Sequence, residues 1–121
     1  MRTSTELAQD YIALWNETDA ARRKALLGRT WSEAATYTDP LMKGAGYAEI
    51  DGLIGAVQQR FPEFSFALLG TPDGYGDMTR FSWGLGPKGS EAVIKGTDVV
   101  RRDGDRIAAV TGFLDLVPSA S

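Results

Sequence analysis

The chain has 121 residues, of which 43% are hydrophobic and 24% charged, a length and composition typical of one globular domain. It contains neither cysteine nor histidine, which excludes thiol nucleophiles, disulfides, thiolate or imidazole metal sites and serine–histidine–aspartate chemistry. The net charge is −3 and no basic stripe is present, so we expect no nucleic-acid partner. Any acid–base chemistry must therefore use Asp, Glu, Lys or Tyr.

The start of the given sequence shows no apolar signal region. The N-terminal residues are polar, and no apolar run approaches the ~20 residues that span a bilayer. We therefore expect a cytoplasmic protein with no membrane partner. One domain is expected over residues 1–121, with residues 117–121 as a frayed tail.

Two helices are predicted at the start. Thr3 opens a capping-box pattern, Thr-Ser-Thr-Glu, and apolar residues then recur at helical spacing as far as Trp15. A polar run ends this helix. Thr18 or Asp19 is expected to cap a second, shorter helix, and Gly28 suits the left-handed residue at its C-terminal end.

A strand and a third helix follow. Residues 33–39 favour a strand, which ends at Asp39 because the next residue is proline. Residues 44–46, Gly-Ala-Gly, are expected to form a flexible loop. Residues 47–60 carry apolar side chains at i, i+3, i+4 and i+7, which predicts a strongly amphipathic helix.

The second half of the chain changes to alternating apolar residues, which predicts strands. We expect strands at residues 64–69, 80–85, 92–100 and 107–114, with turns at 71–74, 86–89 and 103–105. Three helices followed by an antiparallel meander argue for an α+β domain. The sheet is expected to be strongly bent, with the helices covering one face.

Two patterns that could indicate a cofactor or a metal are discounted. Residues 84–89 match the glycine string of dinucleotide-binding loops, but predicted strands on both sides favour a hairpin turn. The acidic residues of the predicted turns lack the spacing of a calcium-binding loop. We therefore expect neither a cofactor nor a metal.

Three polar residues lie on otherwise apolar faces. Tyr11 is on the apolar stripe of the first helix, Asp39 ends the first strand, and Asp98 shares a strand face with aliphatic residues. If these faces point inward, a tyrosine and two carboxyl groups enter an apolar interior, where burial raises a carboxyl pKa. Such a group can donate a hydrogen bond when protonated and take a proton when ionised.

Each of the three residues has a structural alternative. Tyr11 could be a core tyrosine whose hydroxyl bonds to the backbone. Asp39 could simply shape the turn before the proline. Asp98 could face outward and pair with Arg80 or Arg101, or be a buried structural acid.

The layout resembles the nuclear transport factor 2-like superfamily, and within it the SnoaL-like domains. The resemblance spans about residues 7–115 and rests on the segments at 9–16 (QDYIALWN), 37–40 (YTDP), 96–98 (GTD) and 105–113 (DRIAAVTGF). It implies a cone-shaped, curved antiparallel sheet wrapped around the three helices, with a pocket between them. It also implies a homodimer that forms through the sheet.

One branch of this superfamily, ketosteroid isomerase, uses an aspartate base together with a tyrosine and a protonated aspartic acid that form the oxyanion hole. By this resemblance Asp39 is the base, and Tyr11 and Asp98 hydrogen-bond the developing enolate oxygen. The first hypothesis is therefore cofactor-free isomerase-type or cyclase-type chemistry on a small apolar carbonyl compound, such as a cyclic ketone or a polyketide-like compound.

The second hypothesis is a non-catalytic ligand-binding or dimerisation domain on the same fold. Some of the sheet and helix aromatic residues could line a ligand cavity or simply fill the core; they are Trp15, Phe66, Phe81, Trp83 and Phe113. The outer face of the sheet would pack against a second copy, and the apolar residues expected on it include Val93, Val99, Val110 and Leu114.

Overall fold

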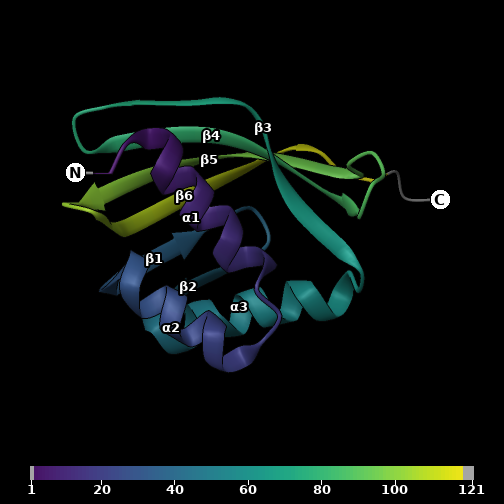
Figure 1. Cartoon of the computed structure of the whole chain (residues 1–121), viewed down its shortest axis with the longest axis horizontal. Coiled ribbons are helices and arrows are strands. Elements are labelled where there is room, and N and C mark those ends of the chain that lie inside the picture. The colour runs from purple at the N-terminus through teal and green to yellow at the C-terminus, as the bar shows by residue number, and fades with distance from the viewer. Residues whose placement is uncertain (1, 119–121) are drawn as a thin grey trace.

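The computed structural model describes residues 2–118 (Figure 1). The elements in chain order are α1 (Ser4–Asn16), α2 (Ala20–Thr30), β1 (Trp31–Thr38), β2 (Lys43–Ala45), α3 (Gly46–Arg60), β3 (Phe64–Tyr75), β4 (Met78–Pro87), β5 (Ile94–Asp103) and β6 (Arg106–Leu116). Of the expected tail, Val117 and Pro118 follow β6 outside regular structure, and residues 119–121 lie outside the described residues.

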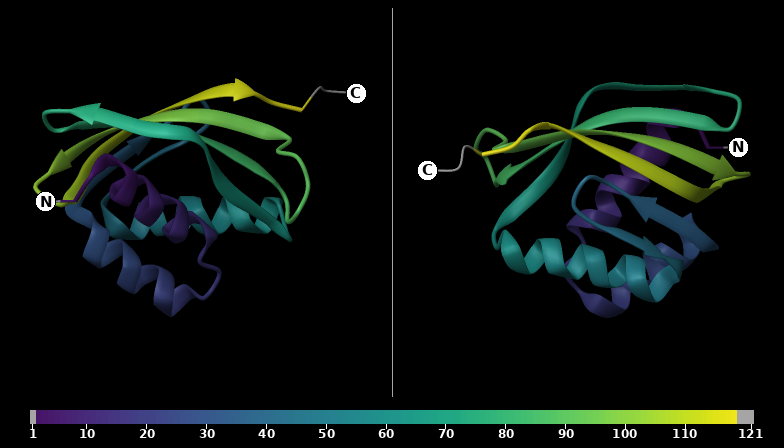
Figure 2. Two further views of the ribbon diagram at one scale, coloured as in Figure 1. Left: turned by 45° about the horizontal axis from the view of Figure 1, so that its top comes forward. Right: turned by 180° about the vertical axis from the view of Figure 1, so that it is seen from behind.

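The strands form one six-stranded sheet in the order β2-β1-β6-β5-β4-β3. Strands β3 to β6 make the predicted antiparallel meander, whereas β1 joins β6 in parallel. The sheet arches over the helices, which all lie against one face (Figure 2). The predicted α+β architecture, with a curved sheet around three helices, is confirmed. Within residues 2–118, no helix has the length and apolar character needed to cross a bilayer.

The helix starts follow local side-chain chemistry. The Thr3 hydroxyl accepts a hydrogen bond from the Glu6 amide at 3.1 Å, and the Glu6 carboxylate accepts one from the Thr3 amide at 2.9 Å. Of the two candidate caps of α2, Asp19 is the one used, because its carboxylate accepts from the Arg22 amide. These bonds satisfy amide groups that have no partner within the helix.

The expected end of α2 at Gly28 is wrong. The helix continues to Thr30, and Gly28 does not adopt the left-handed backbone. The Thr30 hydroxyl donates to the Leu26 carbonyl at 2.8 Å, and the amide of Trp31 donates to the Leu27 carbonyl. These bonds cap the last turn without the glycine, and the fully buried Trp31 then begins β1.

The expected loop at residues 44–46 is also wrong. Lys43–Ala45 form β2, which pairs antiparallel with the end of β1. Gly46 has a positive φ of 81° and turns the chain into α3. A neighbouring strand provides hydrogen-bond partners for this short segment, which local composition does not reveal.

Strand β3 runs through the turn expected at 71–74 and ends at Tyr75. Its pairing with β4 shifts register between Leu69 and Asp73, and Gly70 there has a φ of 71°. Because β3 is an edge strand, the proline at position 72 can lie within this irregularity without breaking an inner ladder. The chain turns instead at Gly76, where φ is also positive.

Strand β6 contains a bulge that changes which residues face the core. Ile107 and Ala109 pair with successive residues of β5, so Ala108 is one extra residue. Ile107 therefore shares the inner face with Val110, which is 2% exposed, and with Leu114, which lines a cavity. The prediction that Val110 and Leu114 lie on the outer face is wrong.

Candidate functional site

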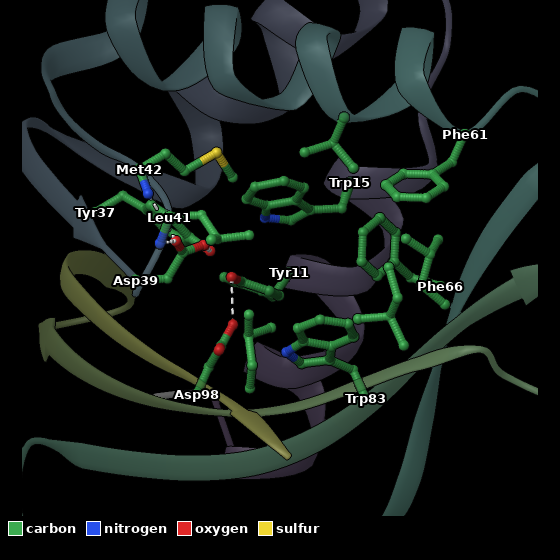
Figure 3. Close-up of a pocket in the computed structure, with 14 residues that line it drawn as sticks. Tyr11, Trp15, Tyr37, Asp39, Leu41, Met42, Phe61, Phe66, Trp83 and Asp98 are labelled. Atoms are coloured by element: carbon green, nitrogen blue, oxygen red, sulfur yellow. Dashed lines mark hydrogen bonds between the residues drawn. The ribbon is translucent and has the colours of Figure 1, made fainter. Parts of the chain in front are cut away.

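A cavity of about 90 Å³ lies between the helices and the concave face of the sheet (Figure 3). Its walls come from α1, β1, α3 and the inner faces of β3 to β6. The lining is largely apolar, and consists of Tyr11, Trp15, Tyr37, Asp39, Leu41, Met42, Val57, Phe61, Phe66, Trp83, Leu85, Ile94, Asp98 and Leu114. All three of the predicted acid–base residues therefore lie on this one cavity.

Tyr11 and Asp98 form a buried pair. The Tyr11 hydroxyl, on α1, donates to Oδ2 of Asp98, on β5, at 2.5 Å, and the two residues are 3% and 1% exposed. Tyr11 thus bonds to a side chain and not to the backbone. Asp98 points inward and not toward Arg80, which pairs with Asp73 on the exposed part of the sheet.

Burial dominates the ionisation of this pair. It raises the pKa of Asp98 to about 6, although the hydroxyl of Tyr11 and the indole N–H of Trp83 both act to lower it. Burial also raises the pKa of Tyr11 well above its usual range, and the nearby charge of Asp98 adds to this effect. Near pH 6 the Asp98 carboxyl is therefore present in both its protonated and its ionised form.

Asp39 shapes a turn and also lines the cavity. Its Oδ1 atom accepts from the backbone amides of Leu41 at 2.8 Å and Met42 at 2.9 Å, across the proline. Its Oδ2 atom accepts from the Tyr37 hydroxyl at 2.7 Å. Asp39 can therefore both shape the turn and face the cavity, because the hydrogen bonds that build the turn also fix its carboxylate beside the cavity.

Sequence reasoning did not single out Tyr37. It is 4% exposed, burial raises the pKa of its hydroxyl, and its ring lies 5.5 Å from that of Trp15. The sequence did contain a signal for Tyr37, because one face of the strand carries Ala35, Tyr37 and Asp39 in alternation. A tyrosine two residues before an inward carboxylate lies on the same face and can reach it.

Of the five aromatic residues expected to line a ligand cavity, Trp15, Phe66 and Trp83 do so. Phe81 does not, because it is packed in the core with its ring 4.8 Å from that of Tyr11. Phe113 also does not, because it lies on the outer face of the sheet and is 54% exposed. Its neighbours along β6 face inward, so the pleat turns Phe113 outward.

Two glycines on the inner face make room for site residues. A Cβ atom at Gly112 would lie 2.8 Å from Oδ1 of Asp98 and 3.2 Å from Cβ of Asp39. A Cβ atom at Gly96 would lie 2.3 Å from the indole ring of Trp83. The glycines therefore let the two carboxyl groups and the indole lie directly against the sheet.

The chain belongs to the SnoaL-like domain family, whose family model matches residues 8–110. It is similar to a candidate isomerase of the SnoaL-like family from Agrobacterium tumefaciens, with 49% identity and a TM-score of 0.86. The match covers 90% of this chain and 94% of that one. No curated protein matches the chain.

More distant solved structures share the fold. A protein from Catenulispora acidiphila with a ketosteroid isomerase-like fold, in complex with trimethylamine, has 16% identity and a TM-score of 0.72 over 92% of this chain and 85% of that one. A candidate polyketide cyclase from Sinorhizobium meliloti has 16% identity and a TM-score of 0.69 over 88% of this chain and 92% of that one. At this identity the similarity shows the fold alone.

Proposed function

We propose that this SnoaL-like domain catalyses proton transfer at a carbon next to the carbonyl group of a small, largely apolar compound. The observation that carries the proposal is the convergence of two carboxyl groups and the Tyr11 hydroxyl on one apolar cavity. This reaction needs a group that takes a proton from carbon and hydrogen-bond donors where negative charge develops on oxygen. The cavity walls hold both kinds of group.

The family resemblance supplies the assignment of roles. The Asp39 carboxylate takes the proton from the carbon, which leaves an enolate, and returns it to the same or a neighbouring carbon. Tyr11 and the protonated form of Asp98 hydrogen-bond the enolate oxygen. The pKa of about 6 for Asp98 supports this role, because a substantial fraction of the carboxyl is protonated at mildly acidic pH.

The size of the cavity limits the substrate. At about 90 Å³ it is smaller than the engineered cavity of about 150 Å³ that takes benzene. The cavity therefore encloses less than a whole six-membered ring of the substrate, and the remainder extends from the mouth. The candidate isomerase from Agrobacterium tumefaciens supports this chemistry, and the trimethylamine complex of the more distant protein shows a small compound bound on the same fold.

The test is the exchange of α-hydrogens of cyclohexanone for deuterium in D₂O, followed by proton NMR. The protein is expected to accelerate exchange above the buffer rate. Tyr11→Phe and Asp98→Asn should each lower the rate by about 10²–10³-fold, the loss expected for one oxyanion donor. Asp39→Asn should abolish the acceleration.

Asp77→Asn, which changes an exposed carboxyl in the β3–β4 turn, is the control and should retain the wild-type rate. Exchange no faster than in buffer would contradict the proposal. So would an unchanged rate in the Asp39 variant.

A non-catalytic ligand-binding role is the second candidate, and one observation favours it. Both tyrosine hydroxyls of the cavity already bond to a carboxylate, Tyr11 to Asp98 and Tyr37 to Asp39. The cavity could then serve to hold a ligand without any proton transfer. Binding of cyclohexanone with no exchange of its α-hydrogens would select this second role.

A further inference from the structure

The hydroxyl donors of the cavity are already used. A tyrosine hydroxyl carries one hydrogen, and those of Tyr11 and Tyr37 are directed at Asp98 and Asp39. A ligand oxygen that enters the cavity therefore meets two hydroxyl groups whose hydrogens are committed to carboxylates. While these carboxyl groups are ionised, the donors that are free to meet it must come from other side chains.

Two such donors line the cavity. The indole Nε1 atoms of Trp15 and Trp83 are buried and make no hydrogen bond of regular geometry among residues 2–118, although that of Trp83 lies close enough to Asp98 to help lower the pKa of its carboxyl. In Figure 3 the nitrogen atom of Trp83 lies on the edge of its ring that faces Asp98, and that of Trp15 lies on the edge that faces Leu41 and Asp39. We call these two N–H groups the open donors. Because a buried donor without a partner is unfavourable, a ligand acceptor that reaches the open donors would be bound preferentially.

Packing holds both indoles in place. The Trp15 ring lies 5.5 Å from Tyr37 and 5.6 Å, edge to face, from Phe66, and is 4% exposed. The Trp83 ring lies 5.3 Å from Phe66 and rests on Gly96, where a Cβ atom would collide with it. The open donors are therefore oriented before a ligand arrives, which lowers the entropy lost on binding.

An unpaired indole does not by itself mark a site. Trp31 Nε1 is also buried without a partner within the described part of the chain, but Trp31 stacks on Tyr11 and does not line the cavity. What distinguishes the open donors is their position on the cavity wall. Oδ1 of Asp98, which also has no partner within residues 2–118, lies on the same wall.

We propose that the open donors bind acceptor oxygens of the substrate, so that Trp15 and Trp83 are substrate-binding residues that orient its carbonyl group. This inference rests on the proposed function for the identity of the oxygen as a carbonyl. It defines the ligand class as a small compound, apolar apart from one or two acceptor oxygens. A hydrocarbon of the same shape leaves the donors unpaired and is rejected.

The three tryptophans of the chain make a direct test possible, because each gives one indole N–H signal in a ¹⁵N–¹H NMR spectrum. The signals are assigned from Trp→Phe variants at positions 15, 31 and 83, or from nuclear Overhauser contacts where a variant does not fold. The protein is then titrated with cyclohexanone and, separately, with methylenecyclohexane, which replaces the oxygen by carbon.

The Trp15 and Trp83 signals should move downfield with cyclohexanone, and the Trp31 signal, the internal control, should not move. Methylenecyclohexane should cause no downfield shift. Trp15→Phe and Trp83→Phe should each weaken cyclohexanone binding by about tenfold, the effect of one lost hydrogen bond, while Trp31→Phe should not.

Deuterium exchange measured in the same samples separates this inference from the proposed function. Indole shifts without exchange would support the open donors and overturn the catalytic role. Exchange with unmoved Trp15 and Trp83 signals, or with undiminished binding in both variants, would overturn the open donors and leave the catalytic role intact. No change in either signal up to the solubility limit of the ketone would also overturn the inference.

Discussion

The Asp98 carboxyl is subject to opposing influences, and their balance affects stability. Burial raises its pKa from 3.8 to about 6, while the hydrogen bond from Tyr11 opposes the shift. The folded chain therefore keeps a proton that the unfolded chain loses between about pH 4 and pH 6. The contribution of Asp98 to the free energy of unfolding must fall as the pH rises through this range, and then stay constant.

Asp98→Asn should remove this pH dependence, because the amide keeps an acceptor oxygen for Tyr11 but cannot ionise. The wild-type protein should lose about 2–3 kcal/mol of stability relative to the variant between pH 4 and pH 7. Urea unfolding at several pH values measures this difference. The exposed Asp77→Asn variant is the control for the change in charge. If the difference in unfolding free energy between wild type and the Asp98 variant did not change with pH, the raised pKa of Asp98 would be refuted.

Substitution of Gly112 is expected to lower the rate of proton exchange. The methyl group of Gly112→Ala would lie 2.8 Å from Oδ1 of Asp98, so the carboxyl must move. We expect proton exchange to fall by about 10²-fold, as for a catalytic group misplaced by about 1 Å. Gly28→Ala, at a helix position with open space around it, is the matched control and should retain the wild-type rate. An unaffected rate in the Gly112 variant would show that this close approach is not needed.

At the scale of elements, helix starts follow from a few neighbouring residues, as the cap of α2 shows. Asp19→Ala removes the acceptor for the Arg22 amide and should cost about 1 kcal/mol of unfolding free energy. Asp19→Ser, which can still cap the helix, should cost much less. Denaturant unfolding of the two variants measures both effects, and equal losses would mean that the cap bond contributes nothing.

The strands, unlike the helix starts, depend on residues that are distant in the sequence. Their alternation predicted where β4, β5 and β6 lie, but no local pattern marks the extra residue in β6, and the turn-forming residues at 71–74 mark a register shift within β3 and not the expected turn. Both irregularities depend on the partner strand, which local sequence does not contain. One extra residue reverses every later side chain, and Val110 was assigned to the wrong face for this reason.

At the scale of the whole molecule, the outer face of the sheet is the proposed homodimer interface. Phe113 and Leu69 are exposed there, on either side of the hydrogen-bonded hydroxyl pair of Ser82 and Thr97. Sedimentation equilibrium at roughly tens of micromolar, the range in which ordinary homodimers persist, should give twice the monomer mass. Phe113→Arg should shift the protein to monomer.

Tyr75→Arg changes a more exposed aromatic residue, 84% against 54% for Phe113, at the far end of the β3–β4 hairpin, and should leave the dimer intact. Wild-type protein that sediments only as monomer would contradict the interface. A Phe113 variant that dimerises as well as the wild type would place the contact elsewhere.

The sequence by itself determined the helices, the alternating strands, the family resemblance and the three polar residues at apolar positions. These depend on periodicity and on short-range chemistry, which a chain carries locally. Only the tertiary structure decided that Tyr37 joins Asp39, that Phe113 faces outward, and that two glycines make room for the site. Bulges, pairing register and close approach of backbones are relations between distant segments, so they exist only once the sheet has closed over the helices.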